Sequence, residues 1–188
     1  KDNDMKLLWQ INFPHSLGML YSAFTYYCGF KVNSGEYKLM GLAPYGEPIY
    51  VNKILDELIN INEDGSFRLN MSYFKYHRGL RMISNKFRNL FGRDERYPRE
   101  KIDKFYADMA ASIQIVLEKV VIRLVDNLIR ESGEDNLCLA GGVALNCVAN
   151  EKIIEKIGEG KLWIQPAAGD AGSSLGCALG YLYKKNNI

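Results

Sequence analysis

The chain has 188 residues, which is enough for one domain with a sizeable core or for two small lobes. Its 24 basic and 22 acidic residues nearly balance, so nucleic-acid binding has no electrostatic support. No signal peptide is visible, and no apolar run approaches the roughly 18 residues that a membrane-spanning helix needs. We therefore expect a cytoplasmic protein that does not act at a membrane.

The first third of the chain reads as short alternating elements. Period-two apolar residues before Pro14 predict a strand, and Asp64-Gly65 has the turn chemistry of a hairpin. The expected elements are a strand over 5–13, a helix that follows His15-Ser16 and closes at Gly29, helices over 37–42 and 51–60, and a hairpin over 62–69.

The middle of the chain is aromatic and basic, and we expect one helix there, over 80–91. Its cationic residues favour a solvated helix face over a phosphate site. These residues are Lys75, His77, Arg78, Arg81, Lys86, Arg88, Arg93 and Arg96.

A long central helix over 99–130 follows, because its apolar residues keep a helical period. The last third then alternates between strands and helices, which predicts a layered α/β fold. The expected order is strand 136–140, helix 143–157, strand 161–165 and helix 172–183.

The four cysteines lie in apolar or small-residue stretches, and none forms a CxxC pair. We expect reduced core thiols rather than disulfides or zinc ligands. They are Cys28, Cys138, Cys147 and Cys177.

The clearest candidate site is the turn at Gly141-Gly142, where a buried strand runs directly into a helix. Glycines allow a ligand to approach the backbone, and free N–H groups at a helix start favour a polar or anionic group. Asn146, expected one turn into that helix, could reach the same ligand. The pattern alone slightly favours a plain packing turn.

A second strand runs into a small-residue turn that carries one carboxylate, Asp170. Asp170 could be a helix N-cap, or it could be a metal ligand at the crevice where α/β folds bind ligands. A single carboxylate does not make a metal site.

Two further windows hold candidate polar residues. In the window 34–46, Glu36, Lys38 and two glycines, Gly46 among them, could line a phosphate or sugar site, although a helix start followed by a turn is favoured. His15, between a strand and a helix, could be a general acid or base, although a local structural role is favoured.

Taken together, these segments resemble the NodU family of O-carbamoyltransferases. The matching blocks occur in the family's order and span nearly the whole chain. They are FPHSLG at 13–18, YSAFT at 21–25, GEYKLMGLAPYG at 35–46, DMAASIQ at 108–114, LAGGVALNC at 139–147 and PAAGDAG at 166–172.

The resemblance implies an incomplete actin-like, ribonuclease-H-like ATPase (ASKHA) fold with a long central helix. It gives Gly141, Gly142 and Asn146 a role in binding ATP or carbamoyl adenylate, and it makes Asp170 a ligand of a divalent metal, commonly iron. Gly46 is carried over as a further nucleotide contact. Lys38 is assigned to catalysis by its match to the family, and His15 is added as a candidate acid or base.

The implied enzyme makes carbamoyl adenylate from carbamoyl phosphate and ATP in a YrdC-like domain. It then transfers the carbamoyl group to a hydroxyl of a sugar or natural product. We expect residues 1–188 to be the C-terminal portion of the actin-like domain, without its N-terminal half, the HxxxH metal ligands of that half, or the YrdC-like domain. Alone, such a portion is expected to be inactive and to have an empty metal site.

Two alternatives stay open. One is a relative of the tRNA threonylcarbamoyl transferases, which the motif at 35–46 and the lack of a basic surface disfavour. The other is a non-catalytic, nucleotide-dependent binding module, because actin-like folds also serve as chaperones and filaments.

Overall fold

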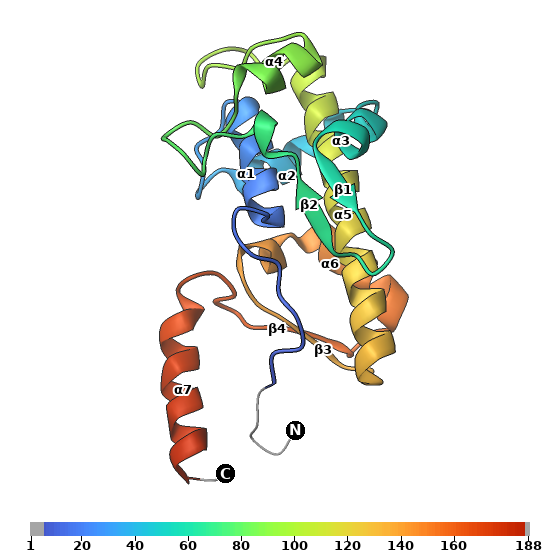
Figure 1. The fold of residues 1–188 in the computed structure, drawn as a ribbon, viewed down its shortest axis with the longest axis vertical. Helices are drawn as coiled ribbons and strands as arrows, with labels where there is room; N and C mark the ends of the chain where they lie inside the picture. The colour runs from blue at the N-terminus through green and yellow to red at the C-terminus, as the bar shows by residue number, and fades with distance from the viewer. Residues whose placement is uncertain (1–5, 187–188) are drawn as a thin grey trace. The chain divides into compact units, whose positions relative to one another are not determined.

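A computed structural model describes residues 6–186, which mix helices with small sheets in an α/β arrangement (Figure 1). The chain divides into two compact units. The larger unit is residues 12–133, and the described part of the smaller unit is residues 6–11 and 134–186. Within the described residues, no helix has both the length and the apolarity to cross a membrane.

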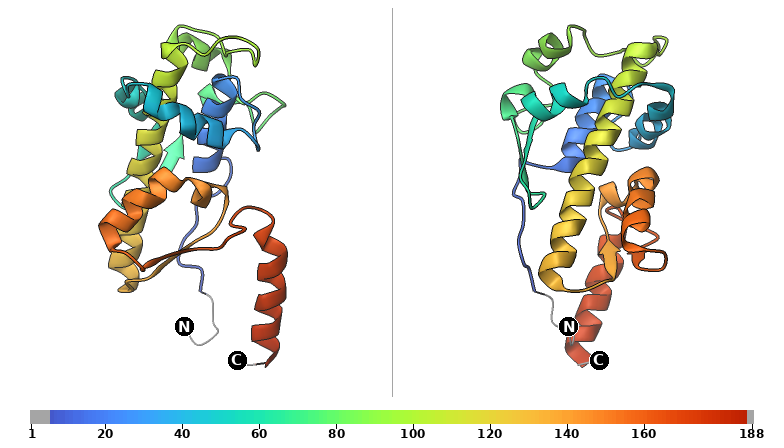
Figure 2. Two further views of the ribbon diagram at one scale, coloured as in Figure 1. Left: turned by 180° about the vertical axis from the view of Figure 1, so that it is seen from behind. Right: turned by 90° about the vertical axis from the view of Figure 1, so that its right-hand side faces the viewer.

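Helix α5 (Lys104–Ser132) is the core element of the larger unit. Its apolar residues recur at helical spacing, and Met109, Ile113 and Val116 are almost fully buried. The helix begins at Lys104, five residues later than the sequence predicts, with Asp103 as its N-cap. Its C-cap is Gly133, whose φ of 67° suits glycine. Figure 2 shows the shorter helices of this unit gathered around one half of α5.

Three elements early in the chain pack on α5: α1 (Leu17–Tyr27), α2 (Glu36–Leu42) with the 3₁₀ turn η1 (Ala43–Tyr45), and α3 (Val51–Glu57). Helix α1 starts where the sequence predicts, because Ser16 caps it by accepting a hydrogen bond from the Met19 amide at 3.2 Å. Its buried aromatic rings meet those of α4 (Asn85–Phe91), with Phe24 and Phe87 centroids 5.3 Å apart.

The predicted hairpin is confirmed as β1 (Ile59–Ile61) paired antiparallel with β2 (Phe67–Leu69). Asp64 organises the turn by accepting hydrogen bonds from the Ser66 amide and hydroxyl, and Gly65 has a φ of 81°. Helix α3 ends at Glu57, not near residue 60, because residues 59–61 take part in this ladder. A 3₁₀ turn, η2 (Met71–Tyr73), follows the hairpin.

The smaller unit has the alternation that the sequence predicts. Its elements are β3 (Leu137–Leu139), η3 (Gly142–Leu145), α6 (Cys147–Ile157), β4 (Leu162–Ile164) and α7 (Gly172–Asn186). Strands β3 and β4 pair in parallel.

The strand expected over residues 5–13 is wrong within the described residues; Met5 lies outside them. Residues 6–12 pair with no strand in the part of the chain that the structure describes, and Leu7 is 71% exposed. Alternating apolar residues predict a strand only when a ladder partner and a core face are present.

The basic stretch is a helix face only in part, because Lys86 and Arg88 alone of its eight residues lie on α4. The helix expected from residue 80 begins only at Asn85, and residues 75–82 form a loop. Arg96 is buried, with its guanidinium donating to the carbonyls of Cys28 at 2.7 Å and Glu100 at 2.5 Å. It therefore holds the chain after α4 against the end of α1.

The cysteine prediction is only partly right. No disulfide joins the four cysteines, but Cys28 alone is buried, and Cys138, Cys147 and Cys177 are exposed. Burial raises the pKa of the Cys28 thiol well above its usual value. The other three lie in the smaller unit, whose short strands and helices expose much of their apolar surface.

Candidate functional site

The two glycine-bearing turns of the smaller unit lie side by side. In the parallel β3–β4 pair, Leu139 is opposite Ile164, so both strands end at the same edge. Beyond that edge, the Gly141 amide donates a hydrogen bond to the Ala168 carbonyl at 2.6 Å. The turn after β3 and the turn after β4 therefore form one continuous surface at the carboxyl end of the strands, where α/β folds bind ligands.

The backbone of the first turn is open to approach. Gly141 and Gly142 are both exposed, and a Cβ atom added at either one would meet nothing within 4 Å. Gly141 has a φ of 95°, in the region that favours glycine. Glycine is needed at 141 for the turn, and the space above Gly142 is free for a ligand.

Asn146 does not lie one turn into a helix, as the sequence suggests. The expected helix over 143–157 is broken at Asn146, which has an extended backbone and is the N-cap of α6. Its Oδ1 accepts a hydrogen bond from the Ala149 amide at 3.0 Å, and the residue is only 8% exposed. Asparagine competes well for such amides, so it favours a cap over a helix interior. The structure gives Asn146 a positioning role at this turn, and its contact with a nucleotide stays a prediction.

Asp170 lies on the second turn with an exposed side chain. It is not the N-cap of α7, which begins at Gly172, although its carbonyl accepts a hydrogen bond from the Ser173 amide at 3.1 Å. Across residues 6–186, no three His, Cys, Asp or Glu side chains gather in a way that could hold a metal ion. The residues present therefore offer one metal ligand and do not make a metal site by themselves.

Gln165 is a polar residue at this edge that the sequence reading missed. It follows β4 directly, and its Oε1 is buried without a hydrogen-bond partner. An unsatisfied buried acceptor beside the two turns could take a hydrogen bond from a ligand hydroxyl or amine. A lone glutamine after a strand carries no sequence signature, so only the structure reveals it.

His15, Lys38 and Gly46 belong to the larger unit, and each has a structural environment of its own. The His15 Nδ1 accepts a hydrogen bond from the Leu69 amide at 3.1 Å, which ties the start of α1 to the hairpin. Lys38 is exposed on α2, with its Nζ 5.8 Å from the centre of the Tyr37 ring. The catalytic roles of His15 and Lys38 stay predictions.

Gly46 is a close-packing position. A Cβ atom there would overlap the Ala107 carbonyl group and lie 2.5 Å from the Asp108 amide nitrogen of α5. The adjoining chain is hydrogen-bonded to the same helix: the Glu47 amide donates to Asp108 Oδ1 at 2.7 Å, and the Tyr50 amide donates to Ser112 Oγ at 3.0 Å. The segments 35–46 and 108–114, which carry part of the family resemblance, therefore dock against each other.

The Glu36 carboxylate forms hydrogen bonds within this segment and to α1. It accepts hydrogen bonds from the Ser22 hydroxyl at 2.8 Å and from the Asn33 and Gly35 amides at 2.9 and 3.1 Å. These bonds fix the start of α2 against α1. They leave the exposed Lys38, rather than Glu36, as the polar group of this window that is open to a ligand.

Comparison with known proteins agrees with the resemblance. Residues 1–179 match the family model described as "Carbamoyltransferase N-terminus". The chain belongs to this carbamoyltransferase family, within which its motifs are of the NodU type.

Its relatives are longer proteins. One is "Uncharacterized protein sll1178" of Synechocystis sp., 60% identical over 94% of this chain and 29% of its own length. "Nodulation protein NolO" of Bradyrhizobium diazoefficiens is 33% identical over 90% of this chain and 29% of its own length. "Nodulation protein NolNO" of Sinorhizobium fredii is 34% identical over 89% of this chain and 23% of its own length. The chain thus spans less than a third of the length of each of these relatives.

Proposed function

We propose that the protein carrying this chain is an O-carbamoyltransferase that transfers a carbamoyl group from carbamoyl adenylate to a hydroxyl of a sugar or natural product. The donor is made from carbamoyl phosphate and ATP. The observation that carries the proposal for this chain is the junction of its two glycine-bearing turns, where the Gly141 amide meets the Ala168 carbonyl at 2.6 Å. Membership of the carbamoyltransferase family supports the reaction class.

In the transfer step, the acceptor oxygen attacks the carbamoyl carbon and the bond from that carbon to the adenylate oxygen breaks. The hydroxyl proton passes to a base, and AMP leaves as a stabilised anion. We assign nucleotide contact to the backbone at Gly141 and Gly142, because the space above them is open. Asn146 holds the turn in shape by capping α6. The buried Oε1 of Gln165 is an additional acceptor for a hydroxyl of the nucleotide.

Asp170 is proposed as a single metal ligand, because its exposed carboxylate follows the second strand end. An iron or other divalent ion there would need further ligands from outside the described residues. When bound, such an ion would act as a Lewis acid toward a carbonyl. The actin-like form of the α/β fold and the cytoplasmic location are part of the same proposal.

The reaction is tested in the whole protein with carbamoyl phosphate, ATP and a panel of hydroxylated acceptors, following AMP release and the carbamoylated product. Unmodified tRNA is the competing acceptor. Product from small acceptors supports the proposal, whereas modification of tRNA alone, in a parallel assay supplied with threonine, bicarbonate and ATP, would favour the threonylcarbamoyl relatives. Absence of any carbamoyl-phosphate-dependent turnover would favour a non-catalytic module.

Two variants test the site itself. Gly142→Val should abolish nucleotide binding, because its side chain fills the open space above the turn, and the fold should remain intact. Asp170→Ala should remove bound metal and transfer while leaving nucleotide binding in place. Unchanged ATP affinity in the first variant, or unchanged metal content in the second, would contradict these assignments.

A further inference from the structure

A loop in the larger unit is closed firmly at its base and presents cations around a hollow. Phe74 and Ile83 form an antiparallel bridge, and both are almost fully buried. The Lys75 amide donates to the Met82 carbonyl at 3.0 Å, which closes residues 75–82 into a loop. The two ends of the loop, at Lys75 and Met82, are therefore hydrogen-bonded to each other.

Tyr76 anchors the loop to the start of the unit. Its hydroxyl donates a hydrogen bond to the Pro14 carbonyl at 2.6 Å, and its ring packs near those of Phe74 and Phe13, with centroids 5.8 and 6.3 Å away. The loop is therefore held at its base and through Tyr76.

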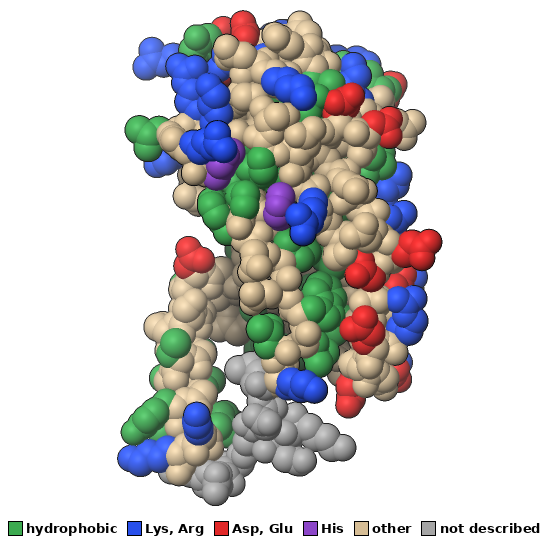
Figure 3. All heavy atoms as spheres, in the orientation of Figure 1, with side chains coloured by type: hydrophobic (Ala, Val, Ile, Leu, Met, Phe, Trp, Pro, Cys, Tyr) green, Lys and Arg blue, Asp and Glu red, His purple; other side chains and the backbone are tan. Residues whose placement is uncertain are grey.

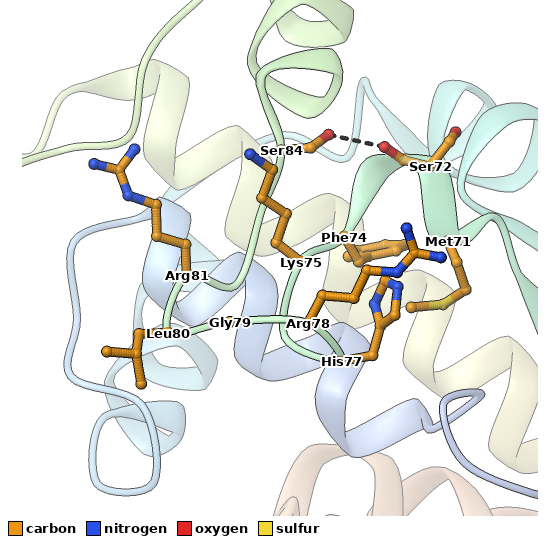
Figure 4. Close-up of a pocket in the computed structure, with 10 residues that line it drawn as sticks. All are labelled: Met71, Ser72, Phe74, Lys75, His77, Arg78, Gly79, Leu80, Arg81 and Ser84. Atoms are coloured by element: carbon orange, nitrogen blue, oxygen red, sulfur yellow. Dashed lines mark hydrogen bonds between the residues drawn. The ribbon is translucent and has the colours of Figure 1, made fainter.

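The hollow has a volume of about 570 Å³, and no Asp or Glu is among the described residues that line it. Lys75, Arg78 and Arg81 line the hollow. In Figure 4 the Lys75 side chain extends upward between the two arginines, Arg81 lies on the left and Arg78 lies on the right beside His77, while Leu80 points downward, away from Lys75. On the face drawn in Figure 3, Lys and Arg side chains gather beside a histidine at the upper left, over the loop drawn green in Figure 1.

Neighbouring cations of the basic stretch are already paired. Arg88 binds Glu95 at 2.7 Å, and Arg93 binds Asp103 at 2.6 Å. Lys86 has its Nζ 4.2 Å from the centre of the Tyr73 ring. By contrast, Lys75, Arg78 and Arg81 form no ion pair with any Asp or Glu among the described residues.

The lining also contains hydrogen-bonding groups. The Nδ1 of His77 is buried without a partner, and in Figure 4 the ring nitrogens face the Arg78 side chain. Ser84 donates its hydroxyl to the Ser72 carbonyl at 2.9 Å, which holds the wall behind Lys75. A buried ring nitrogen without a protein partner is available for a hydrogen bond from a bound molecule.

We propose that this basic pocket, lined by Lys75, His77, Arg78 and Arg81, binds the phosphate group of a small phosphorylated molecule. Like charges around one hollow repel each other, and a dianion relieves that repulsion better than a single carboxylate does. Guanidinium groups match phosphate oxygens with paired N–H donors, and lysine adds a point charge. The hollow is large enough for a phosphate ester rather than for the inorganic ion alone. The residues that line the pocket belong to the larger unit, whereas the glycine-bearing turns belong to the smaller one.

The test is isothermal titration of the whole protein with inorganic phosphate, pyrophosphate and a sugar phosphate, at constant ionic strength set with chloride. Arg78→Gln with Arg81→Gln should weaken binding of each at least about tenfold. The matched control is Arg99→Gln with Lys101→Gln, which removes the same net charge from exposed residues outside the pocket and should leave binding unchanged. Melting temperatures of all variants verify that the fold is retained.

Equal loss of binding in the pocket and control variants would overturn the proposal, because it would reduce the effect to net charge. So would undiminished phosphate binding in the pocket variant, or binding of RNA with no binding of the small phosphates. Carbamoyl transfer is measured in the same variants. Loss of phosphate binding there with transfer retained supports a site independent of catalysis, and an inactive wild-type protein that still binds phosphate would refute only the proposed function.

Discussion

Replacing Gly46 with alanine tests whether the 35–46 segment is shaped by packing or by a ligand. The added Cβ would overlap the Ala107 carbonyl of α5, and helix backbone cannot move aside as a flexible side chain can. The segment must therefore shift away from α5. Overpacking of this kind costs about 1–3 kcal/mol.

The shift also stretches two hydrogen bonds to α5. The first joins the Glu47 amide to the buried Asp108 carboxylate, and the second joins the Tyr50 amide to Ser112 Oγ. A bond to a charged group contributes about 1.5–3 kcal/mol and a neutral one about 1 kcal/mol. With partial loss of both, we expect Gly46→Ala to destabilise by about 4 kcal/mol, which lowers the melting temperature by roughly 10 °C for a chain of this size.

The assay is urea and thermal unfolding followed by circular dichroism, with Gly41→Ala as the control from the same motif. A Cβ at Gly41 would meet nothing within 4 Å, and the residue lies inside α2. Alanine there should stabilise by about 0.5–1 kcal/mol. If Gly46→Ala were as stable as the wild type but bound nucleotide less well, the packing argument would be refuted and Gly46 would be a ligand contact.

Three further changes follow from single contacts. Asn146→Ala should lower the free energy of unfolding by about 1 kcal/mol, because it removes the cap of α6, whereas Asn146→Asp keeps the cap. Weaker ATP binding in the aspartate variant, measured by titration, would show that the amide contacts the nucleotide. Unchanged binding would limit Asn146 to positioning. Arg96→Lys should cost about 3 kcal/mol in urea unfolding, because lysine cannot satisfy the several carbonyls that the buried guanidinium bonds; a loss below 1 kcal/mol would contradict this. Burial raises the pKa of Tyr76 to about 12. The contribution of its neutral hydroxyl to the free energy of unfolding is therefore complete below pH 10 and is lost as the pH rises from 10 through 12. Tyr76→Phe should therefore flatten the alkaline fall in stability over that range, and an unchanged slope would argue against it.

Local sequence patterns predicted the elements whose cause is local. The long run of apolar residues at helical spacing predicted α5, and Asp64-Gly65 predicted the hairpin. The alternation after residue 133 predicted the βαβα order of the smaller unit. Each of these signals lies within one segment, so no tertiary contact is needed to interpret it. Where pairing with a distant segment decides, as for residues 6–12, the pattern failed.

The candidate site was harder to predict because a polar residue in a sequence motif does not reveal its hydrogen-bond partner in the fold. His15 was a candidate acid or base with a local structural role favoured, and its Nδ1 accepts a hydrogen bond from an amide 54 residues away; its catalytic role stays a prediction. Asn146 was placed inside a helix, yet it breaks that helix to cap the next. The basic pocket was hidden for a related reason: the bridge of Phe74 to Ile83 makes a loop where the sequence suggested a helix.

Glycine shows most clearly how the structure separates these roles. Gly46 and Gly142 both stand in motifs that carry the resemblance, and the resemblance assigns both to a ligand, although the pattern alone favoured structural turns. The structure gives them opposite surroundings: α5 backbone occupies the space where a Gly46 side chain would lie, whereas nothing lies within 4 Å of a Cβ at Gly142. We therefore expect a substitution at Gly46 to act through stability, while its contact with a nucleotide stays a prediction. One at Gly142 can act only through what approaches the turn, so a Gly142→Val protein that melts like the wild type but no longer binds ATP would separate ligand approach from packing within a single chain.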